Sequence, residues 1–193
     1  MTVRRVGITG HTDLTKRTAE LIHQCLLEEL RGYPEGRSHG VTCLADGADQ
    51  VFAAALLAAG GDFDVILPAR DYRSSAIHPD NRDRFDSLLA RARCVRPMPF
   101  ARCGNEAYTA ASAELVRGID RLVAVWDGKP QGLPGGTTHT VALARRAGVP
   151  VTRIWPPGAR RRPPDPSGAS DLLTQPGSGR EVSLRSPHPV APT

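Results

Sequence analysis

Glycine, threonine and aspartate residues gather in three short segments of this sequence; two follow a run of apolar residues directly, and the third follows such a run after a short polar stretch. The segments read Thr-Gly-His-Thr-Asp at residues 9–13, Asp-Gly-Ala-Asp at residues 46–49 and Gly-Gly-Thr-Thr at residues 135–138. Backbone N–H groups of glycine-rich turns bind phosphate and other anions, especially where a helix starts directly afterwards. Aspartates near such a turn can accept hydrogen bonds from sugar hydroxyl groups. Together the three segments predict a site for a phosphate-bearing ligand.

The first segment offers a turn and a candidate base. Gly10 allows the backbone to approach a ligand closely, and the helix that follows begins with N–H groups that can bind an anion. His11 is a candidate general base, and Thr12 and Asp13 are candidate ligand contacts. A tight turn in which Thr12, Asp13 or Thr15 caps the helix explains the same residues without a ligand. Neither the dinucleotide pattern GxGxxG nor the phosphate-loop pattern GxxxxGK occurs in the chain.

The second segment supports two interpretations. Asp46 can cap the following helix, and Asp49 adds a carboxylate to its first turn, where negative charge is favourable. In the alternative, Gly47 and Ala48 are small because a ligand lies across them. Asp46 or Asp49 would then bind a ribose hydroxyl or the edge of a base, and Asp46 is also a candidate catalytic residue.

The third segment combines a glycine-rich turn with hydroxyl groups at the start of a helix. Converging N–H groups and threonine hydroxyls suit an anion, although a glycine turn capped by threonine is the simpler alternative. The candidate ligand contacts in this part of the chain are Asp127, Gly128, Gly135, Gly136, Thr137 and Thr138. Asp127 also joins His11 and Asp46 as a candidate catalytic group.

Strand-like and helix-like segments alternate along most of the chain and predict how these turns are positioned. Strands are expected at residues 3–9, 41–44, 63–67, 94–96, 122–126 and 149–155, and helices at residues 15–31, 48–59, 81–92, 105–116 and 138–147. Such alternation predicts an α/β fold with a mostly parallel sheet between two layers of helices. Ligands of such sheets bind at the carboxyl ends of the strands, where the strand order reverses. All three polar segments follow predicted strands.

The C-terminal part of the chain differs from the rest in composition. Residues 156–193 hold 9 of the 17 prolines and no Phe, Trp or Tyr. A segment with so little apolar surface cannot offset the entropy of ordering. We therefore expect one domain at residues 1–155 and a disordered tail at residues 156–193. The arginine cluster at residues 160–162 is either a solvated linker or an electrostatic contact for nucleic acid or a protein partner.

Composition narrows the class of protein. The longest apolar run, residues 51–59, is far shorter than the about 20 residues that a membrane span needs, and no secretory signal is evident. The four cysteines form no CxxC pair and predict reduced thiols rather than a disulfide or metal site. The net charge of +5 is weak evidence for nucleic acid. We expect a cytoplasmic protein without a metal or cofactor, and neither a membrane nor nucleic acid as partner.

Three blocks carry a resemblance to a known group of proteins. They read VGITGHTDL at residues 6–14, LADGADQVFAAALLAAGGDFDVILP at residues 44–68, and IDRLVAVWDGKPQGLPGGTTHTVALARRAGVPVTRIWP at residues 119–156. Over roughly residues 3–155 the chain resembles the SLOG superfamily, which includes LOG-type phosphoribohydrolases, the DNA-processing protein A domain and YpsA-like proteins. The resemblance implies a Rossmann-like three-layer sandwich, a nucleotide or nucleotide-derived ligand and, because relatives commonly dimerise, a homodimer as one arrangement. The contacts that it implies are Gly10, Thr12, Gly47, Gly135, Gly136 and Thr137.

One departure from the superfamily bears on activity. LOG-type enzymes carry the pattern PGGxGTxxE, whose Glu takes part in cleaving the N-glycosidic bond of a nucleoside monophosphate. Here Thr140 or Ala142 stands at that position, depending on the alignment. The first hypothesis is therefore a binding module or sensor for a nucleotide. The alternative is a phosphoribohydrolase that uses Asp127, Asp46 or His11, and single-stranded DNA binding ranks third.

Four further residues extend the first hypothesis. Arg70 and Arg73, just after the strand at residues 63–67, either bind phosphate oxygens or are solvent-exposed. Asn105 and Tyr108 begin a helix that should face the same edge of the sheet. Tyr108 either stacks on a base or packs in the core.

Overall fold

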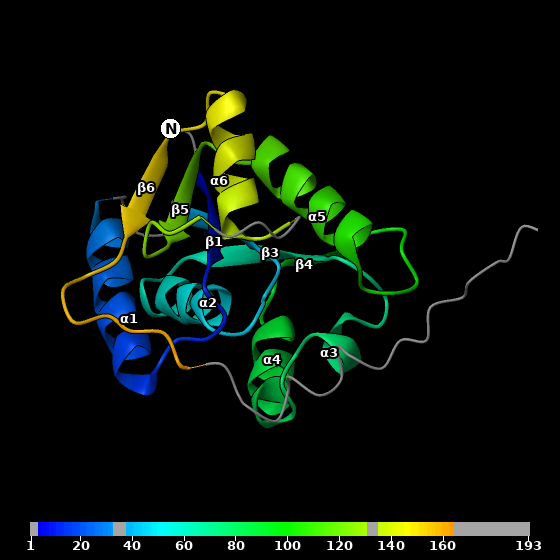
Figure 1. Ribbon diagram of the computed structural model, residues 1–193, viewed down its shortest axis with the longest axis horizontal. Helices are drawn as coiled ribbons and strands as arrows, with labels where there is room; N and C mark the ends of the chain where they lie inside the picture. The colour runs from blue at the N-terminus through cyan, green and yellow to red at the C-terminus, as the bar shows by residue number, and fades with distance from the viewer. Residues whose placement is uncertain (1–3, 33–37, 131–134, 164–193) are drawn as a thin grey trace, which may run out of the picture. The chain divides into compact units, whose positions relative to one another are not determined.

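The computed structural model describes residues 4–32, 38–130 and 135–163, which form an α/β fold built on one sheet (Figure 1). Within these residues six strands pair in the order β4-β3-β2-β1-β5-β6, and every pairing is parallel. The strands are β1 (Arg4–Gly10), β2 (Ser38–Thr42), β3 (Asp62–Leu67), β4 (Cys94–Pro97), β5 (Arg121–Val125) and β6 (Val151–Ile154). The structure confirms the predicted class of fold, and the sheet is entirely parallel rather than mostly so.

Helices cover both faces of the sheet. They are α1 (Lys16–Arg31), α2 (Ala48–Ala58), α3 (Tyr72–Ser75), α4 (Arg82–Leu89), α5 (Asn105–Arg117) and α6 (Thr137–Arg146), with a short 3-10 turn at Pro79–Asn81. In Figure 1, α1, α2 and α4 lie below the sheet, and α5 and α6 lie above it. In the described part of the chain, no helix combines the length and apolarity that crossing a membrane requires.

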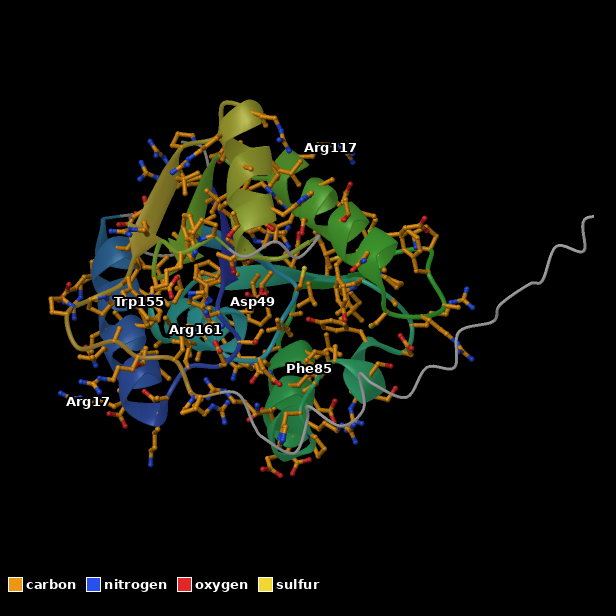
Figure 2. The ribbon with its side chains drawn as sticks, in the orientation of Figure 1. Arg17, Asp49, Phe85, Arg117, Trp155 and Arg161 are labelled. Atoms are coloured by element: carbon orange, nitrogen blue, oxygen red, sulfur yellow. The ribbon has the colours of Figure 1, made fainter. Side chains whose placement is uncertain are left out.

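The two helical layers bury separate apolar cores against the sheet. Successive residues of β5 alternate between them: Val123 faces the core of α1, α2 and α4, whereas Leu122 and Ala124 face the core of α5 and α6. Phe85 of α4 is buried in the first core, while Arg17 and Arg117 project outward from α1 and α5 (Figure 2). A sheet buried on both faces explains why its strands read as continuous apolar runs.

Strand β2 begins at Ser38, whereas the sequence predicts a strand at residues 41–44. Its early residues are polar or small, yet they are buried between neighbouring elements. The His39 ring lies between two carboxylates of β3, with Nδ1 2.5 Å from Asp62 Oδ1 and Nε2 3.0 Å from Asp64 Oδ2. A Cβ on Gly40 would lie 2.2 Å from a side-chain carbon of Leu56 in α2. The contacts that bury the first residues of this strand come from segments distant in sequence. A local sequence pattern therefore does not predict where the strand begins.

Two helical predictions also change. The helix expected at residues 81–92 ends earlier, at Leu89, and α3 (Tyr72–Ser75) is not predicted at all. A single four-residue turn carries too few residues for a helical period to be recognisable. Tyr72 is nevertheless buried in the first core, where it contacts Phe85 ring to ring.

The folded unit extends to Arg162, beyond the boundary at residue 155 that the sequence predicts. Residues 156–162, called the C-terminal strap below, run from β6 along α1 (Figure 1). The backbone of the strap is hydrogen-bonded to the start of α1: Thr15 N–H donates to Arg160 O (3.3 Å), and Arg160 N–H donates to Thr18 Oγ1 (2.7 Å). The predicted disorder thus does not apply to these residues, and residues 164–193 lie outside the described ones.

The buried face of α2 provides a test of the packing. Leu56 is fully buried, while its neighbour Leu57 is only partly buried. Leu56→Ala is expected to lower the free energy of unfolding by about 2–5 kcal/mol, because it leaves a cavity between α2 and the sheet. Leu57→Ala is the matched control and should cost clearly less. Urea unfolding of both variants measures the difference, and equal costs would contradict the burial of Leu56.

Candidate functional site

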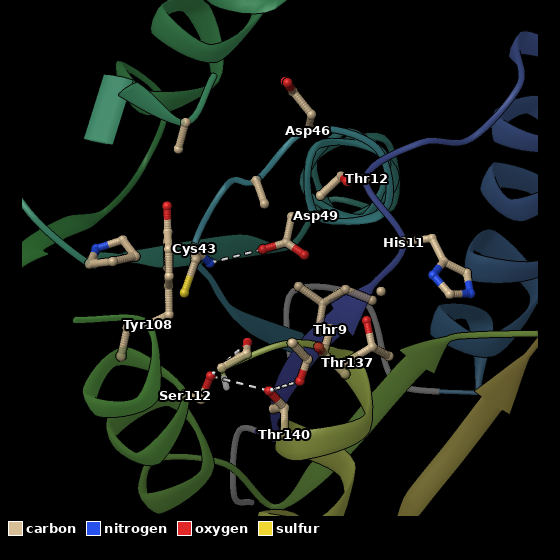
Figure 3. Close-up of a pocket in the computed structure, with 18 of the residues that line it drawn as sticks. Thr9, His11, Thr12, Cys43, Asp46, Asp49, Tyr108, Ser112, Thr137 and Thr140 are labelled. Carbon is tan, nitrogen blue, oxygen red and sulfur yellow. Dashed lines mark hydrogen bonds between the residues drawn. The ribbon is translucent and has the colours of Figure 1, made fainter. Parts of the chain in front are cut away.

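A cavity of about 370 Å³ opens at the carboxyl edge of the sheet (Figure 3). It lies at the ends of the adjacent strands β1 and β5. The chain continues from β1 to β2 on one side and from β5 to β6 on the other, so the connections after these two strands run in opposite directions. This is the position at which parallel sheets bind ligands. The three polar segments predicted from the sequence all contribute to its lining, together with residues of α5.

One wall of the cavity carries hydroxyl groups from α5 and α6. Thr140 Oγ1 lies 3.1 Å from both Ser112 Oγ and Gly136 O, and Ser112 Oγ donates to Gly135 O at 3.3 Å. Thr137, the first residue of α6, is buried beside them. Figure 3 shows this group of side chains below the centre of the cavity. Helix α6 begins here, and both its dipole and the backbone N–H groups of its first turn favour an anion.

The turn before α6 needs glycine for a packing reason. Gly135 has a φ of +73°, and a Cβ there would lie 2.3 Å from Cβ of Tyr108 in α5. Only glycine accommodates both the left-handed backbone and the close approach. The turn is therefore packed tightly against α5, which aligns the start of α6 with Tyr108 and Ser112.

Asp49 lies on the opposite wall and is buried. Its Oδ2 accepts hydrogen bonds from Thr42 Oγ1 (3.0 Å) and from the Cys43 backbone N–H (3.1 Å), and the latter is drawn in Figure 3. Burial raises the pKa of Asp49 to about 6, against the opposing effect of these donors. Burial also raises the pKa of the adjacent Cys43 thiol. Below about pH 6 the inner wall is therefore close to neutral, and above that pH Asp49 carries a negative charge.

Asp46 is held by protein contacts at the upper rim. Its Oδ1 accepts from Gln50 Nε2 (3.1 Å), and its Oδ2 accepts from the His78 backbone N–H (2.9 Å). The prediction that Asp46 caps α2 is wrong, because Gly47 is the N-cap residue and no side chain caps this helix. Asp46 instead joins α2 to the segment before α4.

Gly47 and Ala48 are small because the protein itself lies across them. A Cβ on Gly47 would lie 2.4 Å from His11 O, and Ala48 N–H donates to the same oxygen at 3.1 Å. Gly10 meets a similar limit, since its Cβ would lie 2.5 Å from Cβ of Ala48. The sequence interpretation that a ligand lies across Gly47 and Ala48 is replaced by this contact between the loop after β1 and α2.

His11 directs its ring away from the cavity (Figure 3). The ring meets Trp155 edge to face, with centroids 5.3 Å apart, and Nε2 lies 3.2 Å from both the backbone N and Oδ1 of Asp127. Burial, with a smaller effect of Arg161, lowers the pKa of His11. A neutral ring accepts the Asp127 N–H, so both candidate catalytic groups are engaged in joining β1 to β5 and β6.

Asp127 is mostly buried and lies outside the lining of the cavity. Burial alone would raise its pKa, but the Lys129 backbone N–H and Arg161 together hold the pKa below its usual value. Its Oδ1 accepts from Lys129 N–H at 2.9 Å. Asp127 is therefore a charged carboxylate that stabilises its own turn.

Asp13 lines the cavity and pairs with Arg161 of the C-terminal strap. Arg161 Nε lies 3.0 Å from both carboxylate oxygens of Asp13, and Nη2 lies 2.8 Å from Oδ2. Thr15 caps α1 by accepting from Thr18 N–H, so Asp13 and Thr12 are not the caps. Thr12 is exposed and also lines the cavity.

The predicted site residues divide into two sets. Those that line the cavity are Gly10, His11, Thr12, Asp13, Asp46, Asp49, Gly135, Gly136, Thr137 and Tyr108. Those outside the lining are Gly47, Asp127, Gly128, Thr138, Arg70, Arg73 and Asn105. Of the two alternatives for Arg73, the structure agrees with the solvent-exposed one: Arg73 is exposed and pairs with Asp86 between α3 and α4, with Nη2 2.5 Å from Oδ2.

Several lining residues are not among the predicted site residues: Thr9, Cys43, Tyr72, Ser112, Thr140 and Arg161. Ser112 lies one turn after Tyr108 among small residues of α5, and that polar position in an apolar stripe is the signal that could have identified it. The sequence marks Arg161 only as a member of the arginine cluster at residues 160–162, whose segment has the composition of a linker. Among the described residues, no three His, Cys, Asp or Glu side chains come together to hold a metal ion.

Comparison with known proteins finds solved structures that are similar to this chain. No protein-family model and no curated protein sequence matches the chain. DNA processing protein A from Streptococcus pneumoniae is similar with a TM-score of 0.58 at 16% identity, over 79% of this chain and 50% of that one. DNA processing protein A from Helicobacter pylori, reported for its single-stranded DNA binding mode, is similar with a TM-score of 0.58 at 17% identity, over 89% and 72%. The protein TM1055 has a TM-score of 0.51 at 19% identity, over 77% and 72%.

These similarities show a shared fold. They confirm the Rossmann-like architecture expected from the SLOG resemblance, for a chain that spans about half the length of the Streptococcus pneumoniae protein. At identities below 20%, the cavity of this chain has to be interpreted from its own residues.

The buried carboxyl group of Asp49 predicts a pH dependence. Folding raises its pKa to about 6, so the folded state favours the protonated form. That stabilisation is complete below the pKa of the unfolded chain and is lost as the pH rises through the folded pKa. The free energy of unfolding of the natural protein, minus that of Asp49→Asn, should fall by roughly 2–3 kcal/mol between about pH 4 and pH 7. Urea unfolding across this range measures it, and a difference independent of pH would contradict the assignment.

Proposed function

We propose that this chain binds a nucleotide or nucleotide-derived small molecule in the cavity at the carboxyl edge of the sheet, as a binding module or sensor. The observation that carries the proposal is the convergence of an α-helix N-terminus with a hydroxyl-lined wall and a buried carboxyl group in one cavity. Its volume of about 370 Å³ falls within the range of about 300–1,000 Å³ for small-molecule sites.

The phosphate is assigned to the turn before α6. Gly135, Gly136 and Thr137 line the cavity, and the first backbone N–H groups of a helix have no partner within the helix. These donors and the helix dipole favour a negative group. The hydroxyl groups of Thr137 and Ser112 lie on the same wall.

The uncharged part of the ligand is assigned to the inner cavity. Asp49, in the pH range where it is neutral or shares a proton, can exchange hydrogen bonds with a sugar hydroxyl or a base edge. Tyr108 and Tyr72 form an edge-to-face pair, with centroids 6.5 Å apart, and both line the cavity. A base that enters this cavity meets an aromatic and apolar surface.

The two other hypotheses fit the residues less well. A phosphoribohydrolase needs a negative charge or an activated water beside the sugar. The three candidates are committed elsewhere: His11 and Asp127 contact each other, and Asp46 is held by protein donors. Single-stranded DNA binding needs a basic groove with aromatic platforms, whereas three aspartates and one arginine line this cavity.

Substitution at Gly136 tests the phosphate assignment. Gly136 is the N-cap of α6 with a φ of −76°, a conformation open to other residues, and Asp and Asn are both favourable caps. Gly136→Asp places a carboxylate where the phosphate is expected and should weaken nucleoside monophosphate binding by about a hundredfold or more. Gly136→Asn is the matched neutral control and should retain much more of the affinity. Calorimetry with AMP, GMP, CMP and UMP measures binding, and thermal unfolding checks the fold.

Three outcomes would count against parts of this proposal. No binding of any of the four nucleotides by the natural protein would overturn the proposed function. Equal binding by the two Gly136 variants would overturn the placement of the phosphate. Chromatography of the same samples measures any free base that is released from the nucleotides. Such release would show a hydrolase instead of a binding module.

A further inference from the structure

Arg161 of the C-terminal strap lines the cavity although it lies outside the sheet, its helices and the connections between them. Among the described residues that line the cavity, it is the only Arg or Lys. The other ionisable groups of the lining include Asp13, Asp46 and Asp49. The lining of the cavity therefore has one full positive charge, and that charge comes from the arginine cluster at residues 160–162, which the sequence leaves open as a solvated linker or an electrostatic contact.

The guanidinium group of Arg161 is held in a defined position. Asp13 binds it through Nε and Nη2 at 2.8–3.0 Å, and Nη1 lies 3.9 Å from Asp127 Oδ2 at the end of β5. An arginine that is already oriented loses little conformational freedom when it binds a further anion. Its five N–H donors form a planar fork that can contact more than one acceptor group.

The strap is anchored through its backbone, independently of the Arg161 side chain. Arg162 N–H donates to Asp13 O, Thr18 Oγ1 donates to Arg160 O at 2.8 Å, and Leu14 forms an antiparallel bridge with Arg161. Replacing the Arg161 side chain leaves these backbone contacts in place. A change in ligand binding can therefore be separated from release of the strap.

A phosphate group needs more positive charge than the turn before α6 supplies. A helix N-terminus is equivalent to roughly half a positive charge, whereas a phosphomonoester carries about −1.5 to −2 near pH 7. Asp13 and Asp46 add negative charge to the lining of the cavity. Without Arg161, an anionic ligand would meet these aspartates with no compensating cation from the lining.

We propose that Arg161 is a ligand-binding residue that pairs with the anionic group of the ligand and makes the cavity prefer a nucleoside monophosphate over the uncharged nucleoside. This inference rests on the proposed function and adds the C-terminal strap to the binding site. It assigns a specific role to one member of the arginine cluster at residues 160–162, and it leaves Arg160 and Arg162 as exposed neighbours.

The test compares Arg161→Gln with Arg162→Gln in the full chain. Both remove one positive charge from the strap, but Arg162 is exposed and is bound through its backbone. The probes are AMP, GMP, CMP and UMP and their four parent nucleosides. Arg161→Gln should weaken binding of the nucleoside monophosphate by roughly tenfold to a hundredfold and leave nucleoside binding unchanged. Arg162→Gln should change neither, and Arg161→Lys should retain part of the preference because the charge remains.

The outcomes separate this inference from the proposed function. If Gly136→Asp abolishes nucleotide binding but Arg161→Gln behaves like Arg162→Gln, the proposed function stands and the role of Arg161 is overturned. Equal weakening of nucleotide and nucleoside by Arg161→Gln also overturns it, because a structural role would affect both. If thermal unfolding shows that Arg161→Gln is destabilised, Arg161→Lys decides: loss of the monophosphate preference despite the retained charge would contradict charge pairing. Absence of any nucleotide binding by the natural protein overturns both proposals.

Discussion

The position of His11 is the constraint on which the carboxyl edge of the sheet depends. Its backbone N–H donates to Val125 O and its carbonyl accepts from Ala48 N–H, both at 3.1 Å, so one residue joins the ends of β1 and β5 to the start of α2. Its ring accepts from the Asp127 backbone and packs against Trp155 after β6. The wall of the cavity formed by the loop after β1 is therefore set by backbone contacts rather than by flexible side chains. A histidine with this many structural contacts is poorly suited to proton transfer with a ligand.

Charge is distributed unevenly around the cavity. The inner wall of the cavity holds Asp49 and Cys43, whose pKa values are raised by burial. The opposite wall carries the hydroxyl groups of Ser112 and Thr140. Asp13 and Arg161 of the lining form a partly exposed ion pair of full charges. Below about pH 6, where Asp49 is mostly protonated, this distribution favours a ligand with an uncharged polar body and a charged end, since burying an uncompensated charge in the interior would be costly. A nucleotide has this form.

Glycines in this protein show how one sequence signal serves two purposes. Gly47 and Gly135 both adopt left-handed conformations, and a side chain on either would collide with another loop or helix of the same chain. Glycine-rich turns at strand ends are associated with phosphate binding, but here the local requirement is close packing of protein against protein. That packing in turn brings the start of α6 beside α5. The ligand-binding role is proposed from this arrangement and not from the glycines themselves.

The sequence alone determined the alternation of strands and helices, the parallel sheet and the edge at which to look for a site, because apolar periodicity and turn residues are local properties. It also identified most of the loops that line the cavity. Only the tertiary structure decided that β2 begins at Ser38, that His11 turns away from the cavity, and that Asp46 is held by protein donors. The same holds for the strap that delivers Arg161. Each of these depends on partners distant in sequence, whose approach no local pattern encodes.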